Sequence, residues 1–341
     1  MKTIGRCGLA VVLAALAAAP AWAGTDARVG TGGAIELKLP VGARSLALGG
    51  ATLANERGVE ALFFNPAGAA ATESNTEVAF SHTEYIADIN LNYFGLTHGF
   101  GGWGTLGLSA KVLSIGDIQR TSETSPDGTG ETFSPTFATL GATYSRRMTD
   151  RVNFGVTTYY ISEKILQESA TGVAFDFGFQ YDAGYRGLAL GLALKNLGPS
   201  MAFNGTDFEQ NIFRPEDDPT AARRTVTNST AGFELPTFIQ FGASYPLVNQ
   251  AQNRAVLYGA FQNNSFSRDE YKGGLEWTYR NDYALRVGYA GSGKDNELFG
   301  LNYGLGVRVP FGSNHMIVDY AGQRVSNFFS DVHHVSLRMT F

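Results

Sequence analysis

The sequence predicts an all-β fold, a transmembrane antiparallel β-barrel of about fourteen strands with an N-terminal plug in its lumen. Two observations carry most of this prediction. From Asn75 onward, apolar and polar side chains alternate in segments of about ten residues. The chain also combines 42 glycines and 12% aromatic residues with only 17% charged residues, as expected for lipid-facing strands joined by tight turns.

Residues 1–23 have the pattern of an export signal. A charged start (Lys2 and Arg6) precedes an apolar run over residues 8–19 and a small-residue cleavage site at Ala21-Trp22-Ala23. The run is shorter than the roughly twenty apolar residues that a membrane helix needs. We therefore expect cleavage near Ala23 and a mature protein in the bacterial outer membrane.

Loss of this signal changes the chemistry of the chain. The only cysteine, Cys7, leaves with it, which excludes a disulfide or a thiol nucleophile in the mature protein. The net charge changes from −5 to −7, because the signal contains two basic residues and no acidic ones. A chain this acidic, without a basic run, is not expected to bind nucleic acid.

Residues 24–72 lack the alternation of the later chain and predict the plug. Glycine and alanine dominate this stretch and permit close backbone packing. Apolar residues at helical spacing over 59–64 predict a short helix, and Pro66 biases Asn65 away from the helical region, so a turn should follow. Residues 73–341 are then expected to form the barrel.

The alternating segments predict the strands in order. They begin near Thr76, Asp88, Trp103, Phe133, Arg151, Thr171, Gly187, Pro236, Arg254, Tyr271, Asp282, Leu298, Asn314 and His333. If the first strand runs outward, the connections on the periplasmic side are all compact. The two longest connections, residues 116–132 and 198–235, fall on the external side, as is typical of outer-membrane barrels.

Charged residues avoid the apolar face of the predicted strands. Asp176, for example, falls between Phe175 and Phe177, and a lysine or arginine facing the bilayer midplane would cost about 2 to 4 kcal/mol. A soluble β-sandwich also alternates, but its strands are usually about five or six residues long. The residues expected to face the lumen are Asp176, Lys195, Glu276, Arg286, Arg308, Asp319 and Arg338.

A barrel of about fourteen strands leaves a lumen too wide for wall side chains alone to fill. The plug can occupy this space, and it carries charges of its own at Arg44, Glu56, Arg57 and Glu60. Two interpretations of the lumenal charges stay open. They pair between plug and wall, since a charge away from bulk water needs a partner, or they line a wet channel.

Sequence motifs for catalysis are absent or incomplete. The segment GYAGSGKD at 288–295 nearly spells a phosphate-binding loop, but Asp295 replaces the required serine or threonine and no helix follows. His333 and His334 point to opposite faces of one predicted strand. We therefore expect no enzymatic activity, no cofactor and no metal site.

Three short motifs resemble the N-terminal region of the PorV/PorQ-like outer-membrane proteins, which are related to the FadL long-chain fatty-acid transporters. They are Gly42-Ala43-Arg44-Ser45, Leu48-Gly49-Gly50-Ala51 and Asn65-Pro66-Ala67-Gly68. The resemblance implies a plugged barrel and assigns the plug motif to Arg44, Gly49, Gly50, Asn65, Pro66, Ala67 and Gly68. The terminal Phe341 resembles the mark that the barrel assembly machinery reads.

The resemblance implies two functions. FadL relatives imply passage or capture of hydrophobic small molecules, whereas PorV relatives imply a component of a type IX-like secretion system that binds exported proteins at the cell surface. A structural outer-membrane protein is a third possibility. Expected partners are outer-membrane lipids, the assembly machinery, and either a hydrophobic ligand or secretion-system subunits and their cargo.

The long external connection at 198–235 bears on this choice. Its apolar residues fit a greasy entry site, a docking surface for exported proteins, or plain loop packing, and these alternatives stay open. The residues concerned are Phe203, Phe208, Ile212 and Phe213.

Overall fold

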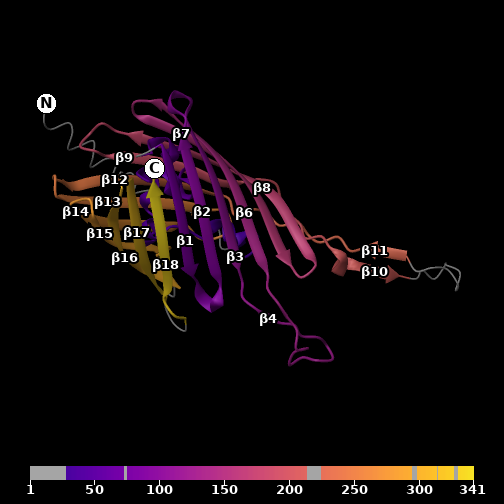
Figure 1. Cartoon of the computed structure of the whole chain (residues 1–341). Helices are drawn as coiled ribbons and strands as arrows, with labels where there is room; N and C mark the ends of the chain where they lie inside the picture. The colour runs from indigo at the N-terminus through magenta and orange to yellow at the C-terminus, as the bar shows by residue number, and fades with distance from the viewer. Residues whose placement is uncertain (1–27, 73–74, 213–223, 294–297, 313, 326–328) are drawn as a thin grey trace.

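Alternating side chains give this chain a closed barrel of fourteen antiparallel strands, as predicted (Figure 1). The computed structural model describes residues 28–341 except 73–74, 213–223, 294–297, 313 and 326–328. The predicted export signal and its predicted cleavage site near Ala23 therefore lie outside the described residues. Among the described residues, no helix is long and apolar enough to cross a membrane.

Each wall strand begins within three residues of its predicted start. The strands are β1 (Thr76–Glu84), β2 (Asn90–Gly99), β3 (Thr105–Ser114), β6 (Thr136–Thr149), β7 (Val152–Ile165), β8 (Glu168–Asp182), β9 (Ala189–Leu197), β12 (Phe238–Asn249), β13 (Asn253–Asn264), β14 (Glu270–Tyr279), β15 (Tyr283–Gly291), β16 (Phe299–Phe311), β17 (Asn314–Val325) and β18 (Val332–Thr340).

The first and last strands close the barrel. β1 pairs with β18 from Glu77 opposite Thr340 to Glu84 opposite His333. The terminal Phe341 extends this pairing, since its backbone N–H donates to the Thr76 carbonyl at 2.8 Å and its carbonyl accepts from the Thr76 N–H at 3.3 Å. Closure leaves no free edge among the wall strands.

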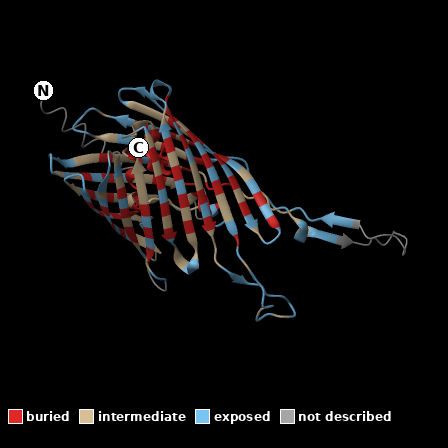
Figure 2. Ribbon diagram, viewed as in Figure 1, coloured by how far each residue is buried: buried red, intermediate tan, exposed pale blue. Residues whose placement is uncertain are grey.

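The two faces of the wall differ in polarity (Figure 2). On β8, Asp176 is 0% exposed, whereas Phe175 and Phe179 on the opposite face are 38% and 44% exposed. The same alternation of buried and exposed residues recurs in the other long strands, and the exposed set is rich in leucine, valine and aromatic residues. The outer surface is thus apolar and the inner surface polar, as a bilayer requires.

The two ends of the barrel differ in their connections, and we call them the short-turn end and the long-loop end. At the short-turn end, β14 and β15 are joined through Arg280 and Asn281, whose φ angles of 54° and 59° give the left-handed turn that suits a hairpin. At the long-loop end, two small hairpins extend beyond the wall (Figure 1). They are formed by β4 (Ile118–Gln119) with β5 (Thr132–Phe133) and by β10 (Glu209–Ile212) with β11 (Arg224–Thr227).

These small hairpins were not predicted, because their strands of two to four residues are too short to show alternation. Three 3₁₀ turns lie in connections between strands, η6 (Ile86–Asp88), η7 (Gly101–Trp103) and η8 (Thr206–Phe208). The other elements lie before β1, in residues 28–72, which we call the plug. They are η2 (Ile35–Lys38), α2 (Ala43–Ala47), η3 (Thr52–Ala54), η4 (Gly58–Glu60), α3 (Ala61–Phe64) and η5 (Pro66–Ala71).

The plug lies inside the barrel, where most of its residues from Ala43 to Ala69 are buried (Figures 1 and 2). The helix predicted over 59–64 is present as η4 followed directly by α3. It ends at Asn65, which is extended with φ −156° and ψ 103°, as expected before a proline. Its Oδ1 then accepts a hydrogen bond from the Ala67 N–H at 3.2 Å and starts η5.

Wall glycines let the plug backbone lie directly on the strands. A Cβ added to Gly155 would lie 2.3 Å from the carbonyl carbon of Pro66, and one added to Gly288 would lie 2.3 Å from that of Leu48. Such distances are far below van der Waals contact, so only glycine fits there. The inward glycines that meet plug backbone atoms are Gly155, Gly178, Gly191, Gly274 and Gly288, while Gly95, Gly107 and Gly304 meet plug side chains.

We expect the substitution Gly288→Ala to destabilise the barrel by about 1 to 3 kcal/mol, because the added methyl group overlaps the plug backbone. The free energy of unfolding can be measured by urea titration of the protein in lipid bilayers. Gly259→Ala is the matched control, since a Cβ at Gly259 meets no atom within 4 Å. Equal stability of the two variants would contradict the close approach of plug and wall.

Candidate functional site

The plug lies between two cavities that share no lining residue. The larger cavity, which we call the vestibule, has a volume of about 690 Å³. Arg268, Ser292 and Tyr85 line it, and all three belong to connections at the long-loop end. The smaller one, which we call the short-turn cavity, has a volume of about 330 Å³ and is lined by Asn281 and Asp282 of a short turn.

The floor of the vestibule is apolar. Plug residues supply much of it, together with Leu91 from β2 and Phe238 from β12. Phe63 and Phe64 of α3 meet edge to face with their ring centroids 5.1 Å apart. The apolar plug residues that line the vestibule are Leu39, Leu46, Phe63 and Phe64.

One side of the vestibule carries charges. Glu270 forms ion pairs with two ammonium groups, with its oxygens 3.7 Å from Lys38 Nζ and 3.3 Å from Lys272 Nζ. Lys38 Nζ also donates to Ser267 Oγ at 2.8 Å. Burial lowers the pKa of Lys38, although the nearby carboxylate of Glu270 acts in the opposite direction. The vestibule therefore combines an apolar floor with a compensated polar wall.

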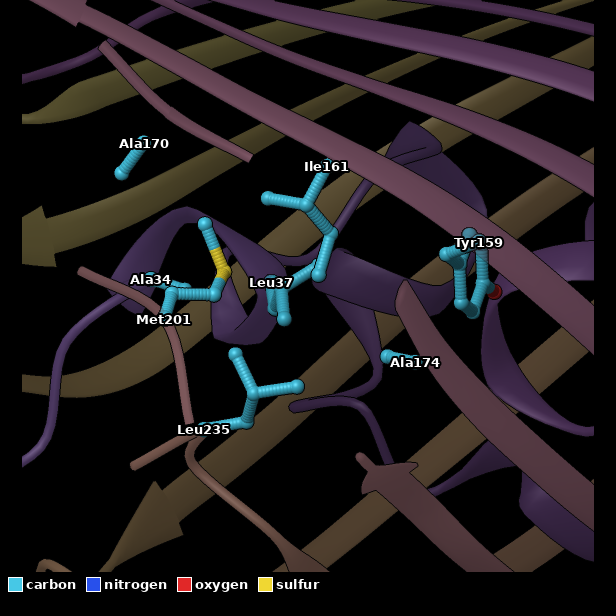
Figure 3. Packing of buried hydrophobic residues seen from close by; sticks show 8 residues of the cluster. All are labelled: Ala34, Leu37, Tyr159, Ile161, Ala170, Ala174, Met201 and Leu235. Carbon is cyan, nitrogen blue, oxygen red and sulfur yellow. The ribbon is translucent and has the colours of Figure 1, made fainter. Parts of the chain in front are cut away.

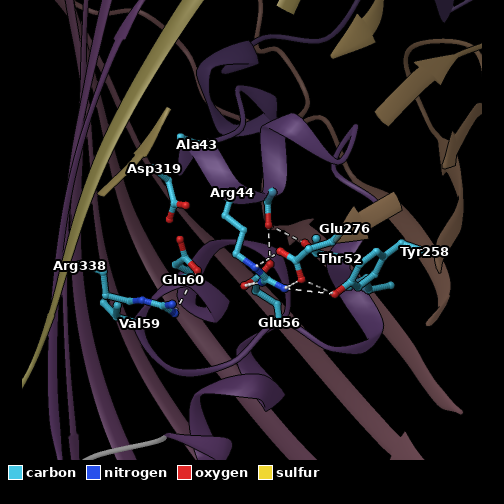
Figure 4. Close-up of polar contacts among 12 residues, drawn as sticks. Ala43, Arg44, Thr52, Glu56, Val59, Glu60, Tyr258, Glu276, Asp319 and Arg338 are labelled. Atoms are coloured by element: carbon cyan, nitrogen blue, oxygen red, sulfur yellow. Dashed lines mark hydrogen bonds and ion pairs between the residues drawn. The ribbon is translucent and has the colours of Figure 1, made fainter. Parts of the chain in front are cut away.

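Below the vestibule, a chain of ion pairs joins the plug to the wall (Figure 4). Arg44 on α2 binds Glu56 of the plug at 2.6 Å and Glu276 of β14 at 3.0 Å. Glu276 also accepts from Arg286 at 2.7 Å, and Arg286 in turn binds Asp319 at 2.5 Å. We call these five residues the ion-pair chain. Each buried charge in it has a partner of opposite sign, which burial requires.

Neutral groups and a second ion pair support this chain. Ser45 donates to Glu56, and Tyr258 donates to Glu276 at 3.1 Å. Nearby, Arg338 of β18 binds Glu60 of the plug at 3.1 Å (Figure 4). Burial raises the pKa of Glu60 to about 7, with the Arg338 guanidinium acting against this shift. Of the two open interpretations, pairing between plug and wall is thus present in the structure.

The Asn-Pro-Ala motif fixes the other side of the plug. The amide of Asn65 donates to the carbonyls of Leu53 and Phe179, both at 3.0 Å, and so ties the plug to β8. Gly68 is also constrained, because a Cβ there would lie 2.1 Å from the Glu56 carbonyl oxygen. The glycine pair is constrained as well: Gly49 has a φ of +66° and lies against the Tyr289 carbonyl.

Two lysines of the wall lie against the ring of Phe63 in α3. Lys195 Nζ donates to the Phe63 carbonyl, lies 4.0 Å from the centre of the Phe63 ring and is 3.4 Å from Asp176. Lys111 approaches the same ring at 4.7 Å and donates to the Glu36 carbonyl at 2.6 Å. Arg308, the remaining lumenal candidate, lines the short-turn cavity.

The root of the long external connection packs into the barrel (Figure 3). Met201 and Leu235 join Leu37 of the plug and Ile161 of β7 in a buried apolar cluster. Phe203 packs against this cluster, with its ring centroid 5.7 Å from that of Phe233. Phe208 ends the 3₁₀ turn before β10 and Ile212 ends β10, while the predicted candidate Phe213 lies outside the described residues.

Sequence reasoning missed several residues that hold the plug. Lys111, Gln180 and Glu77 all lie in the inward phase of their strands, which was a usable signal. Gln180 donates to the Glu56 carbonyl at 2.8 Å, and Glu77 accepts from the Val59 N–H at 3.0 Å. Their partners in the plug were not predictable, because the plug sequence has no repeat from which to place it.

Comparisons with known proteins concern the fold. No protein-family model and no curated protein matches the sequence. The structure is similar to that of the CymD monoaromatic hydrocarbon channel, with a TM-score of 0.57 and 14% identity over 89% of this chain and 98% of that one. It is also similar to the toluene transporter TodX of Pseudomonas putida, with a TM-score of 0.58 and 12% identity over 88% and 97% of the two chains.

A Pseudomonas aeruginosa FadL homologue gives a TM-score of 0.50 and 13% identity over 88% of this chain and 98% of that one. At such identities the likeness defines the fold alone, a closed antiparallel barrel of the kind seen in these proteins. The predicted similarity to FadL barrels is confirmed at the level of fold. The narrower resemblance to PorV and PorQ stays a prediction.

We expect Arg44→Gln to lower the free energy of unfolding by about 3 to 5 kcal/mol, because it leaves the Glu56 and Glu276 carboxylates buried without their shared partner. The control is Arg28→Gln, which breaks a pair with Glu234 whose side chains are 48% and 65% exposed. An exposed pair of this kind contributes about 0 to 1 kcal/mol. Urea titration of both variants in bilayers measures the difference, and similar losses would argue against the ion-pair chain.

Proposed function

We propose that the protein captures small hydrophobic molecules at the outer surface and transfers them across or into the outer membrane. The observation that carries this proposal is the vestibule, a cavity of about 690 Å³ with an apolar floor at the long-loop end. Its volume lies within the range of about 300 to 1,000 Å³ that is common for small-molecule sites. By the usual rule for outer-membrane barrels, the long-loop end is the external end.

The solved structures with this fold support the same class of ligand. CymD is described as a monoaromatic hydrocarbon channel and TodX as a toluene transporter. A vestibule lined by Phe63, Phe64 and Leu91 offers apolar and aromatic contacts to such compounds. On the charged side of the vestibule, Glu270 is paired with Lys38 and Lys272. An apolar ligand can therefore bind beside these charges without separating them from their partners.

We infer two routes out of the vestibule. Passage to the short-turn end requires displacement of α2, since this helix contributes Leu46 to one cavity and Arg44 to the other. Passage sideways would occur near Leu197, where the regular pairing of β9 ends while β8 continues to Glu168. It requires displacement of the segment after Leu197, because Asn204 pairs with Ser169 of β8 and Met201 packs in one buried cluster with Ala170. A register shift between Phe175 and Phe177 on β8 marks the same place as a local irregularity of the wall.

The predicted alternatives, a secretion-system component and a structural surface protein, stay predictions, and the channels with this fold do not favour them. A secretion component would bind exported proteins, and the β10–β11 hairpin beyond the wall is the surface to examine. Co-purification with a large envelope complex in mild detergent would support that role instead.

For the transport proposal, uptake of radiolabelled toluene by cells that express the protein is expected to exceed uptake by cells without it. The substitution Ala290→Trp should reduce this uptake several-fold, because the indole fills part of the vestibule that Ala290 lines. Leu257→Trp is the matched control, since Leu257 is 48% exposed on the outer face. Uptake equal to that of empty cells, or unaffected by a folded Ala290→Trp variant, would refute the proposal for this ligand class.

A further inference from the structure

The short-turn cavity has a composition unlike that of the vestibule. Plug residues form its roof, and six strands, β13 to β18, supply its walls. Its charged lining contains four carboxylates, Glu56, Glu276, Asp282 and Asp319, and no lysine or histidine. The arginines that line it are Arg44, Arg57, Arg254, Arg286, Arg308 and Arg338. Six arginines therefore line one cavity of about 330 Å³.

The charges in the inner layer of this cavity compensate one another. Arg44 and Arg286 belong to the ion-pair chain and take up Glu56, Glu276 and Asp319. Arg338 binds Glu60, which lies next to the cavity in the plug. Three of the four lining carboxylates are thus held by arginines of this layer.

The outer layer is basic. Arg254 on β13 stands opposite Thr278, one inward position nearer to the short-turn end than the Val256–Glu276 pair. Arg57 reaches the same cavity from the plug, and Arg308 reaches it from β16. Both Arg57 and Arg254 are exposed, and neither forms an ion pair with any residue that the structure describes. Asp282 is the lining carboxylate that remains to balance this layer.

This arrangement suits a phosphate group. A guanidinium presents a planar fork of N–H donors that matches two phosphate oxygens, and arginines converging from separate elements can bind one phosphate from different sides. We propose that the short-turn cavity binds a phosphate group carried by a small soluble molecule, with Arg57 and Arg254 as its principal ligands. The volume leaves space for an organic substituent beside the phosphate.

A soluble phosphate compound fits better than the headgroup of a membrane lipid. Arg254 and Arg308 lie in the inward phase of their strands, whereas the opposite face of the same strands carries the exposed apolar residues Leu257 and Val307. The cavity lies inside the wall, between its inner face and the plug, and Arg57 and Arg254 are exposed at the short-turn end. This site is separate from the vestibule in place and in ligand chemistry, so it does not depend on the proposed transport of hydrophobic molecules.

Calorimetric titration of the full-length mature protein in neutral detergent tests the proposal, with inorganic phosphate and glycerol 3-phosphate as probes at low ionic strength. We expect saturable binding at one site that weakens as sodium chloride is added. The double variant Arg57→Gln/Arg254→Gln should bind about tenfold more weakly or worse, because charge-assisted hydrogen bonds are lost. Retained heat-modifiable migration on electrophoresis would show that this variant folds.

Arg280→Gln is the matched control. Arg280 lies at the same end of the barrel, where its guanidinium stacks 5.4 Å from the ring centre of Tyr279, but it does not line the cavity. Its loss should leave the affinity unchanged. Absence of binding by both probes, equal affinity of the double variant and the wild type, or an equal loss in Arg280→Gln would overturn the proposal. Binding to phosphatidylglycerol bilayers without binding to either soluble probe would assign the phosphate contacts to lipid and overturn it as well.

Discussion

The direct contact between the plug backbone and bare strand backbone is the constraint on which this structure depends. At Gly155 and Gly288 the inner wall has no side chain, and the plug carbonyl groups of Pro66 and Leu48 occupy the space where one would stand. Such contact fixes the plug at a defined height and rotation, because a shift along a strand would meet a neighbouring side chain that points inward. The cavities above and below the plug exist because of that fixed position.

The ion-pair chain follows from the same constraint. Once the plug is held against the wall, Arg44 is removed from bulk water and its charge has to be matched on both sides. Glu56 supplies one partner from the plug and Glu276 the other from β14. Glu276 also forms an ion pair with Arg286, and Arg286 forms one with Asp319. The buried charges are therefore neutralised by a series of ion pairs along the wall and not by a single pair.

The sequence is informative about the wall and much less so about the plug. Alternation with period two states which face each strand residue occupies, so the inward placement of Asp176 and Arg286 could be predicted without any contact being known. It does not state which strand residue a plug residue meets. The wall partners of Asn65 and Arg44 lie more than one hundred residues away in the chain, and only the folded geometry brings them together.

The vestibule illustrates the same limit. Its residues come from the plug, from the inward phase of several strands and from their connections, and no motif unites them. The apolar residues of the connection at 198–235 did not locate the vestibule either, since Phe203 packs into the root of the loop and does not line this cavity. An apolar residue in a loop is expected to be buried, but the sequence does not distinguish a residue that anchors the loop from one that binds a ligand.

α2 links the two ends of the lumen. In a helix, residues two positions apart point about 200° apart, so Arg44 and Leu46 face opposite sides of this short helix. Arg44 lines the short-turn cavity and Leu46 lines the vestibule. Any movement of α2 that enlarges the apolar side therefore also moves the arginine that joins Glu56 to Glu276. Opening toward the short-turn end by a movement of α2 therefore has to break these buried pairs together.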